Sequence, residues 1–419
     1  MGFAREFEGS TRMNGPDEDR YVGQRVRMIR ARRGISQQVL ADLAGLSRSA
    51  IAKYETGERP VDSRRTLLAL AKALGVTLGD LTGQVEERFD PSVAGIHGSV
   101  LAIETALWAA GNITPTAPKR TLDQLASAAR EIAALKLECN YAELGPKIAP
   151  VLTECYQHAR DTRGADRDRA WDILAATAHT AAAVLKNFGY QSLAWTAAQE
   201  AEKAAHNGGG TAAHAAAAFI RSQIMLSRPD GLPAALESAT SAGAALGGLA
   251  HTAGEMELCG MLQLQVGLVT AAMGNDPTPH FDEATEQTVR RTYAAPNTSL
   301  LSDPTFVKAN VVLWRMSAAM ERRDAEQVLT LAPQLRPTDL PSEGRRAQYF
   351  VEIGRAQAMR RNYRGSLHAL LHAEHAAPQK VRNMTHVREL AGQMMRSARR
   401  DLTAGELGRL AQRVGVVSA

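Results

Sequence analysis

Residues 36–57, SQQVLADLAGLSRSAIAKYETG, constrain the fold of this chain more than any other stretch. Ser36 and Ser47 each stand just before a short apolar run, where a side-chain oxygen accepts hydrogen bonds from the free amides of a helix start. Gly45 lies between the two runs, at a point where the chain must leave the first helix in a left-handed conformation that costs glycine little. The pattern predicts two short helices joined by a tight turn.

The second of these helices has a polar outer face. Small residues at Ala41 and Ala44 allow the two helices to cross closely, which is the arrangement of a helix-turn-helix. Arg48, Ser49 and Lys53 then lie on the face directed away from the core. Side chains in that place reach base edges in the major groove, so we expect these three to read DNA, with Arg48 best placed for a guanine edge. The alternative for Arg48 is a phosphate contact.

The distribution of charge agrees with a DNA-binding segment. The whole chain of 419 residues has a formal net charge of only +5. Residues 20–83 alone contain twelve Arg or Lys and five Asp or Glu, so the remainder is close to neutral. A basic small domain joined to a nearly neutral large one is typical of a nucleic-acid-binding head on a larger body.

Residues 21–83 resemble the phage-repressor-type (xenobiotic-response-element, Cro/repressor) helix-turn-helix domain. The family pattern of Q-x-x-L-A, G-x-S, I-x-x-x-E-x-G and A-x-x-L-x-V is met here at the following positions: Gln37, Leu40, Ala41, Gly45, Ser47, Ile51, Glu55, Gly57, Ala71, Leu74 and Val76. The resemblance covers about the first fifth of the chain and implies a head of five helices.

The resemblance also assigns roles within the head. It implies a structural ion pair between Arg30 and Glu55, since a partly buried charge needs a partner. It implies that Gln37 touches phosphate and steadies the recognition helix, and that Ser47 presents its backbone amide to a phosphate. From their positions around the recognition helix, we expect further backbone contacts from three arginines: Arg27, Arg59 and Arg64.

Around the core motif, the sequence predicts a helix at residues 21–33, a fourth helix at 61–74 opened by Asp62 or Ser63, and a short fifth helix capped by Thr77 with Asp80. We expect a disordered tail at 1–19, the DNA-binding domain at 20–83, and a linker with a connecting helix at 84–121. In that linker Asp90-Pro91 breaks helix, Gly95 and Gly98 loosen the chain, residues 100–110 form a helix and 111–118 form a loop.

From residue 122 to residue 419 the pattern is helical throughout, with alanine-rich amphipathic runs and short breaks. The breaks recur about every 40 to 50 residues. They fall at Asn140-Tyr141, Gly189-Tyr190, Pro229-Asp230, Gly274-Asn275, Arg323-Asp324 and Asn362-Tyr363. This spacing resembles that of tetratricopeptide repeats, so the expected fold is all-α: a repressor-type head followed by a tetratricopeptide-like α-solenoid. A helical bundle without repeats is the alternative.

Motifs for other functions are absent from the sequence. There is no P-loop, dinucleotide-binding fingerprint, zincin motif or nucleophile elbow, so we expect neither enzymatic activity nor a cofactor. His368, His372 and His375 lie near one another on one expected helix without a completing Cys or carboxylate, so no metal site is expected. The three cysteines are widely spaced and read as reduced and packed. No apolar run is long enough to cross a membrane, and we expect a cytoplasmic protein.

Polar residues inside the otherwise apolar repeat helices are candidates for effector contacts: His179, Arg221, Gln263, Asn310, Arg315 and Arg355. Asn310 is the most suggestive, because an amide pairs with a peptide backbone's donor and acceptor together. A repressor-type head followed by such repeats resembles the peptide-sensing regulators of Gram-positive bacteria, which implies an effector bound by the repeats. Peptide and small-molecule effectors both remain open.

We therefore expect a transcriptional regulator that binds a two-fold operator on double-stranded DNA as a homodimer, since one recognition helix reads only a few base pairs. Dimer and effector contacts are expected within residues 122–419. The alternative is an interaction scaffold, antitoxin-like or otherwise partner-binding, that its head anchors to DNA.

Overall fold

The computed structural model describes residues 21–61, 63–83, 93–109, 120–208, 210–295, 299–397 and 405–416. Within these ranges the chain forms helices and no strand, as the sequence predicts, apart from one isolated bridge between Thr252 and Ala295. The expected tail at 1–19, the Asp90-Pro91 break and the loop at 111–118 lie outside the described residues.

The head contains five helices: α1 (Val22–Arg32), α2 (Gln37–Ala44), α3 (Arg48–Glu55), α4 (Arg64–Ala73) and α5 (Leu78–Thr82). Their starts are those expected from the sequence. The side chains of Ser36, Ser47 and Ser63 accept hydrogen bonds from the helix amides that follow, and Thr77 forms a capping box with Asp80. Gly45 ends α2 at a φ of 63°, the left-handed conformation that the turn requires.

The body contains the other helices of the described residues. They are α6 (Ala94–Trp108), α7 (Leu122–Leu137), α8 (Tyr141–Asp161), α9 (Gly164–Asn187), α10 (Gln191–Gly208), α11 (Thr211–Met225), α12 (Gly231–Gly247), α13 (Ala253–Ala272), α14 (Thr278–Arg290), α15 (Lys308–Glu321), α16 (Ala325–Leu331), α17 (Glu343–Met359), α18 (Tyr363–Ala376), α19 (Pro378–Val381), α20 (Thr385–Ser397) and α22 (Glu406–Arg413). Short 3₁₀ turns η3 (Arg291–Tyr293), η4 (Ala332–Gln334) and η5 (Pro337–Asp339) lie between them.

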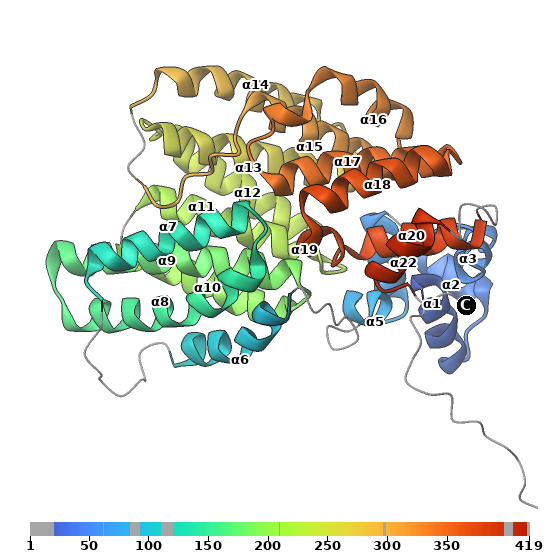
Figure 1. Ribbon diagram of the computed structural model, residues 1–419, viewed down its shortest axis with the longest axis horizontal. Coiled ribbons are helices and arrows are strands. Elements are labelled where there is room, and N and C mark those ends of the chain that lie inside the picture. Colours follow the sequence, from blue (N-terminus) through green and yellow to red (C-terminus); the bar gives the residue numbers. More distant parts are fainter. Residues whose placement is uncertain are drawn as a thin grey trace, which may run out of the picture.

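Successive body helices form hairpins that stack side by side (Figure 1). The helices within each hairpin pack together, as α9 does with α10, α11 with α12, and α17 with α18. Neighbouring hairpins also touch, and one hydrophobic core runs from α6 to α22. All three cysteines are buried and free.

Each predicted break falls between two helices of a hairpin, so the positions of the turns are confirmed. Five of these turns share one backbone conformation, a residue with positive φ two positions after the last residue of the first helix: Cys139, Gly189, Gly274, Arg323 and Arg361. A left-handed residue at this place satisfies the last carbonyls of the helix and reverses the chain. Whether the hairpins are tetratricopeptide repeats stays a prediction.

The expectation for Gly95 and Gly98 is wrong, because both lie inside α6, which begins six residues before the predicted helix. The reason is packing between helices. A Cβ atom at Gly95 would lie 2.4 Å from the carbonyl oxygen of Ala142, and one at Gly145 would lie 2.8 Å from Cα of Ile96. These glycines let α6 and α8 approach each other at backbone distance, so here glycine marks a helix crossing rather than a loose linker.

The head has its own hydrophobic core and docks on the C-terminal part of the body. Its core is formed by buried residues of α1 to α5, such as Val26, Leu40 and Ile51. Figure 1 shows the head, in blue, beside α20 and α22, in red. Among the described residues, no helix is both long and apolar enough to cross a membrane.

Candidate nucleic-acid interface

The N-terminal end of α3 is open to solvent. Ser47, Arg48 and Ser49 are all exposed, and Ser47 Oγ accepts a hydrogen bond of 3.1 Å from the amide of Ala50. The helix start therefore presents its remaining free amides and two side chains in one place. Free amides at a helix N-terminus attract anions such as phosphate, and the adjoining side chains extend past them.

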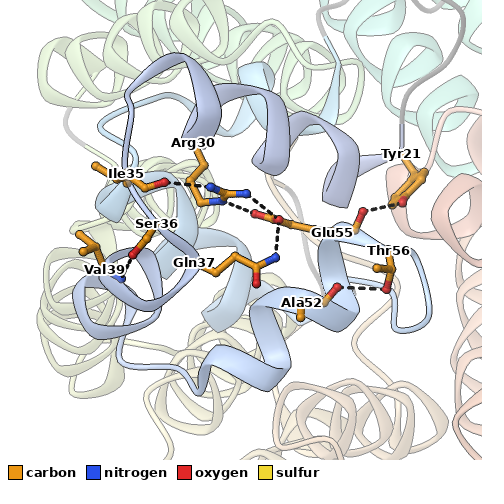
Figure 2. Close-up of polar contacts among 9 residues, drawn as sticks. All are labelled: Tyr21, Arg30, Ile35, Ser36, Gln37, Val39, Ala52, Glu55 and Thr56. Carbon is orange, nitrogen blue, oxygen red and sulfur yellow. Dashed lines mark hydrogen bonds and ion pairs between the residues drawn. The ribbon is translucent and has the colours of Figure 1, made fainter.

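A network of hydrogen bonds behind α3 holds this helix in place (Figure 2). Arg30 Nε and Nη2 donate to the two carboxylate oxygens of Glu55, at 2.6 and 3.0 Å, and Arg30 Nη1 donates to the carbonyl of Ile35 at 2.8 Å. The hydrogen bond with Glu55 raises the pKa of Arg30. The ion pair that the resemblance implies is thus present, and it ties α1 to the end of α3.

Gln37 belongs to the same network. Its side-chain amide donates to Glu55 Oε2 at 2.8 Å, so the first residue of α2 is also tied to the end of α3. The expected steadying of the recognition helix has a physical basis in this bond. A phosphate contact by Gln37 stays a prediction.

The other predicted DNA contacts differ in their surroundings. Arg27 is exposed on α1, and Lys53 is exposed on α3 with Glu58 3.7 Å away. The guanidinium of Arg59 lies 5.4 Å from the centre of the Tyr54 ring. Arg64 instead faces the body, where its Nη1 lies 3.4 Å from Glu321 Oε1. In this arrangement Arg64 forms an ion pair with Glu321. It can contact a DNA backbone only when this ion pair is broken.

Sequence reasoning missed the contacts between head and body. Glu389 of α20 accepts a hydrogen bond of 2.9 Å from the backbone amide of Val22, so a body side chain caps the first helix of the head. The guanidinium of Arg396 lies 4.2 Å from the centre of the Tyr21 ring, and Lys72 pairs with Asp230 at 2.5 Å. No local pattern indicates these pairings, because the partners are far apart in the sequence.

The structure does not bring the six candidate effector residues together. His179 and Arg355 line a cavity of about 590 Å³ between head and body. Arg221, Gln263 and Arg315 lie outside that cavity and contact Glu202, His280 and Asp282 respectively. Asn310 is fully buried, and neither atom of its amide has a hydrogen-bond partner among the described residues.

The three histidines singled out in the sequence all lie on α18. His368 and His372 do approach each other, with their Nε2 atoms 3.3 Å apart. In the part of the chain that the structure describes, no group of three or more His, Cys, Asp or Glu side chains is arranged to hold an ion.

The fold and this site define an all-α protein with an N-terminal helix-turn-helix domain. A protein-family model described as a helix-turn-helix domain matches residues 22–83. The chain is also 37% identical over 68 residues to the SPbeta prophage-derived uncharacterized HTH-type transcriptional regulator YonR of Bacillus subtilis (strain 168). That similarity covers 16% of this chain and 62% of the relative, so the chain matches less than two thirds of the relative's length. No solved structure matches the chain.

Proposed function

We propose that this protein is a sequence-specific DNA-binding transcriptional regulator without enzymatic activity. The observation that supports this most directly is the exposed start of α3, where Arg48 and Ser49 project from a helix braced by Arg30, Gln37 and Glu55. A recognition helix must be held rigidly to place side chains against base edges. The helix-turn-helix match and the regulator name of the relative agree with this proposal.

We further propose that the protein binds DNA as a homodimer and that the body senses an effector. One recognition helix reads only a few base pairs, so two heads about 34 Å apart on a two-fold operator supply the required specificity. The head docks on the body through Glu389 and Arg396, so a ligand that changes this docking also changes how the two heads are presented.

Selection of bound fragments from random duplex DNA tests the proposal. We expect enrichment of a two-fold motif whose half-sites are centred about 10 base pairs, or one helical turn, apart. Binding to the selected site is then compared with binding to a scrambled duplex of the same composition and at the same salt concentration, because phosphate contacts alone respond strongly to salt. Equal affinity for both duplexes, or no binding at low salt, contradicts the proposal.

A further inference from the structure

A cavity of about 590 Å³ lies between the head and the body, beside their direct contacts. Head residues of α4 and α5, among them Arg64 and Leu67, form one wall, and helices α7, α9, α13, α15 and α17 contribute to the others. A volume of this size accommodates a small organic molecule. Because both parts of the chain line the cavity, a molecule inside it contacts head and body together.

The cavity has more cationic side chains than carboxylates. Six cations line it: Arg64, Lys136, Lys186, Arg345, Arg355 and Lys380. Four carboxylates also line it, and each already has partners within the protein: Asp303, Glu321, Glu352 and Glu389.

Lys186 of α9 is the cation with the least compensation. Among the described residues, no oxygen accepts a hydrogen bond from its ammonium group. Partial burial is the main cause that lowers the pKa of Lys186, to about 7, and the neighbouring charges of Arg64, Lys380, Arg345 and Lys136 lower it further. A half-buried ammonium surrounded by like charges is unfavourable unless an anion joins it.

Lys380 lies in the same group of charges. Its ammonium donates to the carbonyl of Gly344 at 2.7 Å, which leaves two of its three donors for another partner. Burial is the main cause that lowers the pKa of Lys380, to about 8, and Arg345 adds to the effect. Among the described residues neither Lys186 nor Lys380 forms an ion pair, although the charge of Glu352 raises the pKa of Lys380 in part.

Trp314 and Gln265, like Arg64, Glu321 and His386, leave polar atoms of the cavity wall without a hydrogen-bond partner in the part of the chain that the structure describes. Trp314 is 5% exposed and its indole N–H has no acceptor among the described residues, with the Arg345 guanidinium 5.6 Å from its ring centre. Gln265 is completely buried, and within the described ranges no group donates to its Oε1. Ser222 donates its proton to Ala235, so its oxygen accepts from Gln265 Nε2, and this fixes the direction of the free Oε1. Buried polar atoms without partners are costly, which favours a ligand that pairs with them.

We infer that this cavity binds a small amphiphilic anion bearing phosphate or carboxylate groups, with Lys186 and Lys380 holding its charge. The indole N–H of Trp314 donates to an oxygen of the same anion, and Gln265 Oε1 accepts from a donor elsewhere on the ligand. Phe219 and Leu268 supply apolar surface for the rest of the molecule. That such an anion is the effector rests on the proposed function, whereas its binding in the cavity does not.

Isothermal titration of the full chain with pyrophosphate and with citrate, at constant ionic strength, tests the inference and separates phosphate from carboxylate. We expect saturable binding of at least one of the two with a Kd below about 1 mM. Lys186→Met and Lys380→Gln should each weaken it by about tenfold or more, because each removes a charge-assisted contact. Lys203→Met is the matched control, since that lysine is exposed on α10. The affinity of this variant for the anion should stay within about twofold of the wild-type value.

Circular dichroism and thermal melting of each variant show whether it folds. If Lys186→Met does not fold, Lys380→Gln still tests the site. Absence of saturable binding by both anions, or equal affinity of wild type and both cavity variants, overturns the inference. Duplex binding is measured separately. Selective DNA binding without anion binding contradicts this site alone, whereas anion binding without any sequence preference for DNA supports this site and contradicts the proposed function.

Discussion

Arg30 and Glu55 show how single residues position the candidate interface. Glu55 is only 3% exposed, and its two oxygens accept hydrogen bonds from Arg30 and Gln37. One carboxylate therefore joins α1, α2 and α3 at the back of the recognition helix. A buried carboxylate left without these donors is much less stable than an exposed one.

Arg30→Met removes the charge and keeps most of the volume of the side chain. We expect the free energy of local unfolding of α3 to fall by roughly 3 kcal/mol, because Glu55 stays buried without its cation. Hydrogen exchange of the α3 amides in the full chain measures this. Arg32→Met on the exposed side of the same helix is the control and should leave exchange unchanged. Equal protection of the α3 amides in Arg30→Met and Arg32→Met would show that the Arg30–Glu55 pair does not stabilise α3.

Arg48 and Arg59 are expected to act differently on DNA. Arg48→Ala should weaken binding to the selected operator by roughly 1–3 kcal/mol and relax the preference at one base position. Arg59→Ala should weaken binding to operator and scrambled duplex alike, since a phosphate contact contains no sequence information. Fluorescence anisotropy with both duplexes measures the difference. Equal losses on the two duplexes for Arg48→Ala would refute its assignment to base reading.

At the scale of elements, glycines set how closely helices approach. A Cβ atom at Gly23 of α1 would lie 1.7 Å from the carbonyl oxygen of Tyr54 in α3, which no side-chain adjustment relieves. Gly98 of α6 has open space around the corresponding position. The two glycines therefore respond in opposite ways to the same substitution.

Gly23→Ala should destabilise the head by about 1–3 kcal/mol or prevent it from folding, because α1 must move away from α3. Gly98→Ala should instead stabilise the body by up to about 1 kcal/mol, the ordinary difference between alanine and glycine on an exposed helix face. Calorimetric melting of the full chain compares them. An unchanged melting profile for Gly23→Ala would contradict the close packing of α1 on α3.

At the scale of the molecule, the central feature is the docking of the head on α20. Glu389 caps α1 through the amide of Val22, and the charges of Arg396, Arg388 and Arg25 face it from α20 and α1. Burial nevertheless dominates and raises the pKa of Glu389 to about 7. A head that leaves its place returns this carboxyl to water and to its ordinary pKa.

Docking of the head should therefore depend on pH. Since the docked carboxyl holds its proton up to about pH 7 and the released one only to about pH 4.5, docking takes up a proton in this window. The docked state is favoured below the window and loses roughly 3 kcal/mol as pH rises through it. Energy transfer between dyes on head and body, recorded from pH 5.5 to pH 8, follows the equilibrium. Glu389→Gln keeps an acceptor for Val22 and should remove most of this dependence; an identical pH profile in this variant would contradict the assignment.

The amino-acid sequence alone determined the local features of this protein. The caps at Ser36, Ser47 and Thr77, the left-handed turn at Gly45 and the positions of the hairpin breaks were all predicted, because each depends on residues within a few positions of one another. The Arg30–Glu55 ion pair was predicted from the family resemblance, because both residues belong to the small helix-turn-helix domain that the resemblance covers.

Only the tertiary structure decided which distant residues meet. Val22 and Glu389 are 367 positions apart, and the cations around Lys186 come from α4, α7, α17 and α19. Gly95 shows the same limit in one residue: glycine locally favours a loose chain, yet here contact with Ala142 makes it the residue that a helix crossing requires. Hydrophobic periodicity indicates which face of a helix is buried but not which helix covers it, so the head–body cavity and its charge appear only once the hairpins are stacked.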